Sequence, residues 1–122
     1  MTRNVTILAI ALCAGLLGFA TAAQVYAGDL AAAQQNYMTF CVKCHGSTGR
    51  GDGPAAATLK KSPRDFTNCV DMKVISDDTL FRVIHDGGGR QGLSPDMPAW
   101  NQGFEDGEIR DLVEYVRTFC KQ

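Results

Sequence analysis

Five consecutive residues, Cys41-Val42-Lys43-Cys44-His45, limit the possible folds of this chain more than any other part of it. Two thiols stand three positions apart, and an imidazole directly follows the second. Three kinds of site use such a set: a redox-active dithiol, part of a zinc site, or a covalent anchor for haem. Each requires different surroundings, so the rest of the chain decides between them.

The first 27 residues differ in composition from the remainder. After a short positive start, the run over positions 5–23 carries no charge, and the small residues Val25 and Ala27 suit a signal peptidase. This pattern predicts an export signal peptide over residues 1–27, cleaved before Gly28, and a mature domain over residues 28–122. An uncleaved anchor is the alternative, because such a run could just cross about 30 Å of hydrocarbon. With cleavage, the sequence predicts a periplasmic or otherwise extracytoplasmic protein without a permanent membrane span.

Export changes the interpretation of the four cysteines in the predicted mature domain, because thiols outside the cytoplasm oxidise unless they are occupied. For zinc, the consecutive residues Cys44 and His45 give poor chelate geometry, and no second close pair follows. A thioredoxin-like dithiol needs strands around it, and the sequence has hardly any strand pattern. Haem attachment is favoured, because the thiols of Cys41 and Cys44 can each add to a vinyl group while His45 binds iron.

Helical patterns occupy most of the predicted domain. Apolar residues recur at helical spacing from Asp29, a candidate N-cap, up to the two thiols. A second helix is predicted over residues 77–86, with Ser76 as its N-cap and Gly87 as its end. A third is predicted over about residues 105–120. The fold class is therefore all-α, with three main helices.

The third helix is expected to pack across the first. Four side chains are predicted to make the crossing contacts: Tyr37, Phe40, Leu112 and Tyr115. The acidic residues of the third helix are expected at its start or on its outer face: Asp106, Glu108, Asp111 and Glu114.

The motif over residues 41–45 is followed, in order, by the stretches GRGDGPAAATL, SPRDF, LFRVIHDGGG and MPAW. Together these stretches resemble the class I c-type cytochrome family, in its small bacterial monohaem form, over about residues 28–120. The resemblance implies a cytochrome c fold of three main helices around one haem c, attached through two thioethers by Cys41 and Cys44. It also implies an electron carrier rather than an enzyme, which cycles between Fe(II) and Fe(III).

Met97 is the favoured second iron ligand beside His45. It lies in LSPDMPAW, where two prolines stiffen a loop, and similar loops in the family carry the distal methionine. Met72, His85 and an open iron site are the alternatives. Met38 lies on the same helix as the thiols, so it cannot reach the opposite haem face, and it is expected to pack in the core.

Pro54 is expected to help hold the iron-bound imidazole. A metal-binding histidine usually donates a hydrogen bond from its second ring nitrogen, and in similar proteins the carbonyl of a proline matching Pro54 accepts it. The alternative is that Pro54 merely starts a turn of helix.

The two remaining thiols, Cys69 and Cys120, are predicted to form a disulfide that ties the loop after SPRDF to the last helix. The alternative is two buried, unpaired cysteines. Basic side chains outnumber acidic ones from Cys41 to Arg64, which predicts a local positive patch formed by Lys43, Arg50, Lys60, Lys61 and Arg64.

The sequence therefore predicts an exported carrier of single electrons whose partners are redox donor and acceptor proteins. A formal net charge of -1 gives no indication of a nucleic-acid partner. Two alternatives remain: a haem-bearing electron-entry subunit of a larger oxidoreductase complex, and a haem enzyme or gas-binding protein with an open distal site.

Overall fold

The computed structural model describes residues 28–120, and every regular element within that range is helical. The expected all-α class is therefore confirmed. The predicted signal peptide lies outside the described residues. Among the helices of the described range, none is long and apolar enough to cross a membrane.

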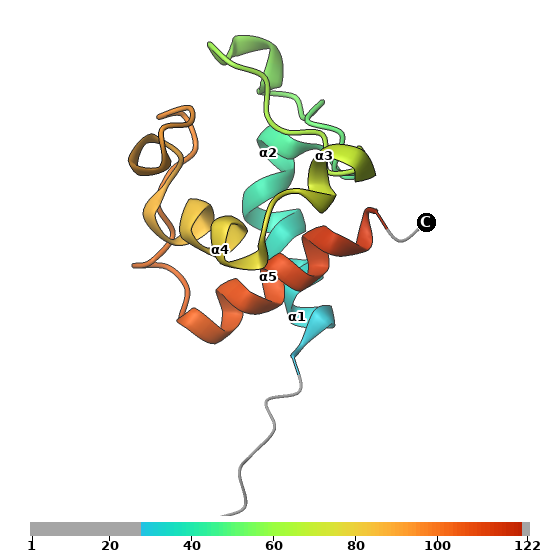
Figure 1. Ribbon diagram of the computed structural model, residues 1–122, viewed down its shortest axis with the longest axis vertical. Coiled ribbons are helices and arrows are strands. Elements are labelled where there is room, and N and C mark those ends of the chain that lie inside the picture. Colours follow the sequence, from blue (N-terminus) through green and yellow to red (C-terminus); the bar gives the residue numbers. More distant parts are fainter. Residues whose placement is uncertain (1–27, 121–122) are drawn as a thin grey trace, which may run out of the picture.

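The first helical segment carries the two thiols and consists of three parts (Figure 1). An α-helix, α1, spans Leu30–Asn36; a π-helical turn, η1, spans Tyr37–Cys41; and a short α-helix, α2, spans Val42–His45. The predicted N-cap is confirmed, because the Asp29 side chain accepts a hydrogen bond from the backbone N–H of Ala32. The π-helical turn was not predicted, and it places an extra residue in the turn before the thiols.

Helices α4 and α5 begin and end close to the positions that the sequence predicts. Helix α4 spans Asp77–Asp86, with the Ser76 side chain accepting from the backbone of the first turn and Gly87, at φ +84°, ending the helix. Helix α5 spans Asp106–Thr118. Its start is a capping box, in which the side chains of Glu105 and Glu108 accept hydrogen bonds from each other's backbone N–H groups.

Three shorter elements lie in the connections: η2 (Ala56–Thr58), α3 (Cys69–Lys73) and η3 (Gly89–Gln91). Helix α3 was not predicted. It is covalently tied to the end of α5, because Cys69 and Cys120 form a disulfide with their Cα atoms 5.3 Å apart. The predicted pairing is thus confirmed.

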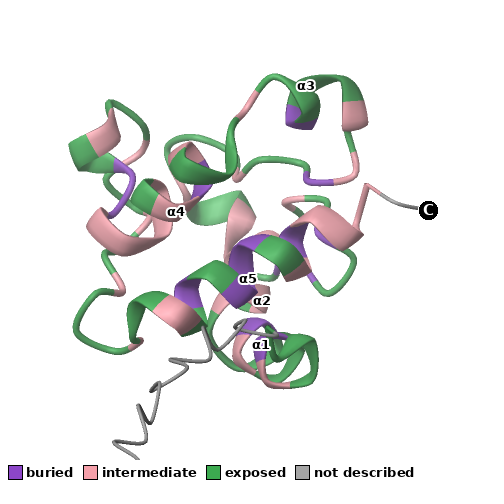
Figure 2. Cartoon of the chain, turned by 60° about the horizontal axis from the view of Figure 1, so that its bottom comes forward, coloured by how far each residue is buried: buried purple, intermediate pink, exposed green. Residues whose placement is uncertain are grey.

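Helix α5 crosses the first helical segment, as Figures 1 and 2 show. Tyr37 is the central contact, since it is 1% exposed and its ring centroid lies 5.3 Å from the ring centroids of both Tyr115 and Phe119. The buried core around it contains seven residues: Tyr37, Phe66, Met72, Leu80, Leu112, Val113 and Val116.

Two packing predictions for the first helical segment were wrong. Phe40 is 47% exposed and its ring packs against Trp100 and Phe104, and Met38 is 44% exposed rather than part of the core. The reason is geometric. Ala33 and Tyr37 form the buried face, and Met38, which directly follows Tyr37, points away from it. Regular α-helical spacing would place Phe40 near that face, but the π-helical turn over Tyr37–Cys41 changes the spacing.

The prediction for Asp111 was also wrong, because this residue is only 5% exposed. Its carboxylate accepts a hydrogen bond from the backbone N–H of Asp29, at 3.1 Å, where α5 crosses the start of α1. The acidic neighbours Asp106, Glu108 and Glu114 are exposed, as predicted.

Arg117 joins α5 to the connection between α3 and α4. Its Nε donates to Oδ1 of Asp77 at 2.8 Å, while its terminal nitrogens donate to the carbonyls of Met72 and Ile75. Together with the disulfide, these bonds hold the 69–77 region against the last turns of α5.

Candidate functional site

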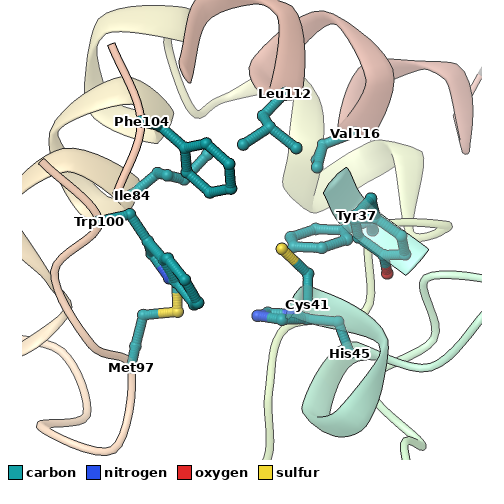
Figure 3. A pocket seen from close by; sticks show the side chains of 10 residues that line it. Tyr37, Cys41, His45, Ile84, Met97, Trp100, Phe104, Leu112 and Val116 are labelled. Carbon is teal, nitrogen blue, oxygen red and sulfur yellow. The ribbon is translucent and has the colours of Figure 1, made fainter. Parts of the chain in front are cut away.

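A cavity opens between the first helical segment, the loop after α4, and α5 (Figure 3). The empty space between these segments is about 360 Å³, which includes open solvent at its mouth. Ten residues line it: Tyr37, Cys41, His45, Phe66, Ile84, Met97, Trp100, Phe104, Leu112 and Val116.

Three of the predicted site residues meet in this cavity. Figure 3 shows Cys41 and His45 on one wall and Met97 on the opposite wall, with their side chains directed into the space between. A thiol and an imidazole therefore face a thioether across an otherwise mostly apolar space. Cys44 and Pro54 are not among the lining residues.

The imidazole of His45 is held by an aromatic ring. Phe66 stacks on it, with the ring centroids 4.7 Å apart and the planes 14° from parallel. Burial lowers the pKa of His45, and the backbone of Arg64 acts in the opposite direction. A neutral ring, with a nitrogen available to bind a metal, is therefore favoured at neutral pH.

The Nδ1 atom of His45 is buried and has no hydrogen-bond partner among the described residues. The expected hydrogen bond to the carbonyl of Pro54 is thus not formed here. Pro54 instead precedes η2 and is exposed. Its role toward the imidazole stays a prediction.

Cys41 and Cys44 are both free thiols. Burial raises the pKa of Cys41 to about 11, with a smaller contribution from the charge of Cys44. The fold therefore keeps the Cys41 thiol protonated at neutral pH. This disfavours a reactive dithiol, which needs a lowered thiol pKa.

Tyr37 lies beside Cys41 in the wall of the cavity, and its hydroxyl group already has a hydrogen-bond partner. Its hydroxyl donates a buried hydrogen bond to the carbonyl of Gly46, at 2.8 Å. Burial, followed by the charge of Cys41, raises the pKa of Tyr37 above its usual value. The ring therefore presents an apolar surface, and the hydroxyl stays neutral.

Met97 is positioned by close backbone packing at the end of α4. The N–H of Gly88 donates to the carbonyl of Met97 at 3.0 Å, and the N–H of Trp100 donates to the carbonyl of Ile84 at 3.0 Å. A side chain at position 88 would begin 2.4 Å from the carbonyl oxygen of Ser94. Glycine is therefore required there for the loop to fold back.

The alternative ligands lie elsewhere. Met72 is 1% exposed within the core cluster. His85 contacts two carboxylates: its Nδ1 lies 2.7 Å from Asp86 Oδ1, and its Nε2 lies 3.6 Å from Asp106 Oδ1. Neither Met72 nor His85 lines the cavity.

Three aromatic residues of the cavity were missed as site residues: Phe66, Trp100 and Phe104. Phe66 and Trp100 lie within the motifs SPRDF and MPAW, which was the available signal. Phe104 packs on Trp100 with ring centroids 5.5 Å apart. Together these side chains give the space between His45 and Met97 an apolar aromatic lining.

The donor set fits a covalently attached haem better than the other interpretations. Free thiols, a buried imidazole with an unsatisfied nitrogen, and a thioether across an apolar cavity are the groups that a c-type haem uses. Residues 28–120 contain no group of three or more His, Cys, Asp or Glu side chains placed to hold a metal ion, as a zinc site would need. The same range contains no strand of the kind that flanks a thioredoxin-like dithiol.

Comparison with known sequences agrees with this fit. Residues 28–116 match the family model described as cytochrome c oxidase, cbb3-type, subunit III. The curated protein cytochrome c-554(548) of Halomonas halodenitrificans is 27% identical over 92 residues, which cover 75% of this chain and 98% of that protein.

Two solved structures share the fold. The c-type cytochrome KustC0563 superposes with a TM-score of 0.60 at 23% identity, over 71% of this chain and 95% of that one. A chain of the Kuenenia stuttgartiensis reducing HAO-like protein complex Kustc0457/Kustc0458 superposes with a TM-score of 0.61 at 28% identity. That alignment covers 74% of this chain but only 43% of the other. The all-α fold is thus the fold of c-type cytochromes.

Proposed function

Because the chain belongs to the c-type cytochrome family described as cytochrome c oxidase, cbb3-type, subunit III, we propose that it carries single electrons between a redox donor and a redox acceptor protein. Two groups of the cavity are poorly suited to acid–base or nucleophilic chemistry, since the Tyr37 hydroxyl already donates a hydrogen bond and the Cys41 thiol is protonated at neutral pH. The apolar lining suits a redox centre that exchanges electrons without binding a substrate.

We propose that one haem c is held by four residues. Cys41 and Cys44 would form the two thioether bonds, and His45 and Met97 would bind the iron. Haem c, when bound, supplies a one-electron Fe(II)/Fe(III) couple. Ligation by histidine and methionine in an apolar site raises the reduction potential.

One observation carries this proposal: His45 and Met97 project from opposite walls of the same apolar cavity, with Cys41 beside the histidine. An open distal site, as in a haem enzyme or gas-binding protein, requires Met97 to be off the iron. The oxidised protein is therefore expected to show the far-red absorption band of methionine-to-iron ligation. Absence of that band, together with cyanide binding at micromolar concentration, would favour the open-site alternative.

We further propose that residues 1–27 are an export signal peptide and that residues 28–122 act outside the cytoplasm. The supporting observations are the uncharged run over residues 5–23 and the Cys69–Cys120 disulfide, which is typical of oxidising compartments. Mass spectrometry of protein isolated from an extracytoplasmic fraction tests both the location and the start of the chain.

A subunit role is the second candidate. One of the similar chains comes from a reducing HAO-like protein complex, and it is more than twice as long as the part that this chain matches. If this chain is likewise part of a complex, it elutes from a gel-filtration column of native extract at the size of that complex. Elution as a small monomer supports the free carrier.

A further inference from the structure

Residues 87–105 form a loop that leaves the end of α4, carries Met97, and returns to the start of α5 (Figure 1). The returning part of the loop lies against the end of α4, because the N–H of Asn101 donates to the carbonyl of His85 at 3.2 Å. The position of Met97 therefore depends on how firmly α4 and α5 are joined at the place where the loop begins and ends.

Side chains of α4 and α5 meet in two pairs at this place. Phe81 and His85 are four positions apart on α4 and share a face, as do Asp106 and Arg110 on α5. Nε2 of His85 lies 3.6 Å from Oδ1 of Asp106. The guanidinium carbon of Arg110 lies 4.7 Å from the ring centroid of Phe81, in a cation–π contact. We call these four residues the neck of the loop.

His85 extends the neck into the loop through its other ring nitrogen. Its Nδ1 lies 2.7 Å from Oδ1 of Asp86, and Nε2 of Gln91 donates to Oδ2 of the same carboxylate at 3.4 Å. Gln91 is the last residue of η3, inside the loop. A chain of polar contacts therefore runs from Asp106 at the start of α5 to the interior of the loop, and His85 is its central member.

Gly87 links the neck to Met97. It directly follows Asp86, and a Cβ at this position would lie 3.1 Å from the carbonyl oxygen of Met97 and 3.0 Å from the backbone nitrogen of Ala99. Backbone packed this closely transmits displacements, because there is no free space to absorb them. A shift of the neck should therefore move Met97 as well.

We propose that His85 is a positioning residue for Met97: by joining Asp86 to Asp106 at the neck, it keeps the loop closed and the thioether directed into the cavity. The inference rests on the proposed ligation of iron by Met97. It assigns a role in the site to a residue that does not line the cavity. Opening of the loop would withdraw the thioether and admit small ligands to the iron.

Hydrogen exchange in the haem-loaded, reduced protein tests the closure of the loop. The amide hydrogens of Gly88 and Trp100 report its opening in NMR spectra, because both N–H groups donate to backbone carbonyls at the base of the loop. His85→Ala is expected to speed their exchange by about two- to fivefold, the effect of a partly exposed polar contact. The amide of Val113, in the middle of α5, is expected to keep its parental rate.

Cyanide binding to the oxidised protein tests the effect on Met97. Cyanide must replace the thioether, so at saturating cyanide the binding rate is limited by the opening of the loop. His85→Ala is expected to raise this rate by the same factor as the exchange rates. His85→Asn keeps a donor near the place of Nδ1 that can bond to Asp86, and it is expected to give a smaller increase.

Two controls separate this role from a general loss of stability. Arg82→Ala removes an exposed side chain from the same helix and is expected to leave the exchange and cyanide-binding rates unchanged. Replacement of Cys69 and Cys120 by alanine destabilises the protein at the other end of α5 and is expected to leave cyanide binding unchanged. Gln91→Ala removes only the contact inside the loop, and its smaller expected increase keeps the test decisive if His85→Ala does not fold.

The outcomes are distinguishable. Faster exchange at Gly88 and Trp100, with faster cyanide binding and parental exchange at Val113, supports the positioning role. Parental rates in the His85 variants, or equal acceleration at all three amides, overturn the role and leave ligation by Met97 intact. A parent protein without the far-red methionine band contradicts the ligation itself, and with it this inference.

Discussion

The ring of Phe66 lies parallel to the imidazole of His45, with centroids 4.7 Å apart. On its other side, at 6.3 Å, Phe66 faces the ring of Phe119. The backbone N–H of Phe66 donates to the carbonyl of Gly49 at 2.7 Å, which fixes the SPRDF segment against the loop after the thiols. The imidazole of His45, the proposed iron ligand, is thus packed against a ring from a distant segment of the chain. Its Nδ1 atom has no hydrogen-bond partner among the described residues.

Phe66→Leu is expected to lower both stability and reduction potential. Loss of the stacked ring should reduce the free energy of unfolding by about 1 kcal/mol, and water should reach the histidine side more easily. A wetter site favours the ferric state, so the midpoint falls. Urea unfolding and voltammetry measure the two effects. Phe119→Leu is the control, because it removes a ring that packs on Phe66 without uncovering His45. This variant should leave the midpoint potential unchanged. Equal shifts of the midpoint potential in the two variants would contradict the role of Phe66.

Met97→Ala is expected to leave haem covalently attached, to open the iron to cyanide or carbon monoxide, and to lower the potential. Spectroscopic titration with each ligand and voltammetry check this. Met38→Ala is a matched control, since Met38 is 44% exposed and is not among the residues that line the cavity. A Met97 variant that keeps the methionine band would show that another residue, such as Met72, is the ligand.

Replacement of both Cys69 and Cys120 by alanine is expected to lower the free energy of unfolding by up to about 4 kcal/mol, because the disulfide spans 51 positions and restricts the unfolded chain. The visible spectrum should not change, since neither residue lines the cavity. Urea unfolding of the haem-loaded protein measures the loss. Two alkylated thiols in unreduced wild-type protein would contradict the bond itself.

The positive patch is expected to act on charged redox partners. Lys60 and Lys61 are exposed and, among the described residues, make no ion pair, whereas Arg64 lies 4.0 Å from Asp71. Reversing both lysines to glutamate should slow oxidation by ferricyanide, an anion, at low ionic strength, and the difference should shrink as salt screens it. Stopped-flow kinetics measure the rates.

The matched control for this experiment changes net charge equally but elsewhere. Lys73 and Arg82 are exposed on α3 and α4, so their reversal to glutamate tests total charge rather than position. Equal slowing in the two double variants would mean that only net charge matters. If the Lys60→Glu/Lys61→Glu variant and the parent protein are oxidised by ferricyanide at equal rates, the patch does not guide the approach of charged redox partners.

The turn before α3, which contains Asp65 and Thr67, should make the folded protein less stable at acid pH. The side chain and backbone of Thr67 donate hydrogen bonds to Oδ1 of Asp65, and they lower the pKa of that carboxyl. Because the pKa of Asp65 is lower in the folded protein than in the unfolded chain, these hydrogen bonds stabilise the fold at pH values above the unfolded pKa of about 3.9. This stabilisation is lost as the pH falls through the pKa that Asp65 has in the folded protein. Thr67→Val should raise the pKa of Asp65, measured by carboxyl NMR; an unchanged pKa would contradict the role of the hydroxyl.

Local features of the fold could be predicted from the sequence because their causes are local. Ser76, Gly87 and the acidic start of α5 mark helix ends through hydrogen bonds within one turn, and each lies where expected. The disulfide was predictable because the predicted mature domain has only two cysteines outside the haem motif. Helix α3 was not, since it is five residues long and is held by the disulfide and by the capping side chain of Asn68.

Features that depend on contacts between distant segments were missed. Asp111 follows the polar side of a helical pattern, yet it is buried because the start of α1 crosses α5 at that residue. Phe40 fits the apolar spacing of a regular α-helix, but it lies in the π-helical turn, and its ring packs against Trp100 and Phe104. Phe66 could be linked to His45 only through the folded chain, since 21 positions separate them.

The π-helical turn over Tyr37–Cys41 makes the number of residues in this stretch as important as their identity. The N–H of Val42 donates to the carbonyl of Tyr37, five positions back, where an α-helix would use four. Deleting one residue here could restore a regular helix, but each residue of an α-helix turns the chain by about 100°. Cys41 and His45 would then rotate together out of the cavity, while Tyr37 kept its contact with α5. The stretch should therefore accept substitutions more readily than insertions or deletions.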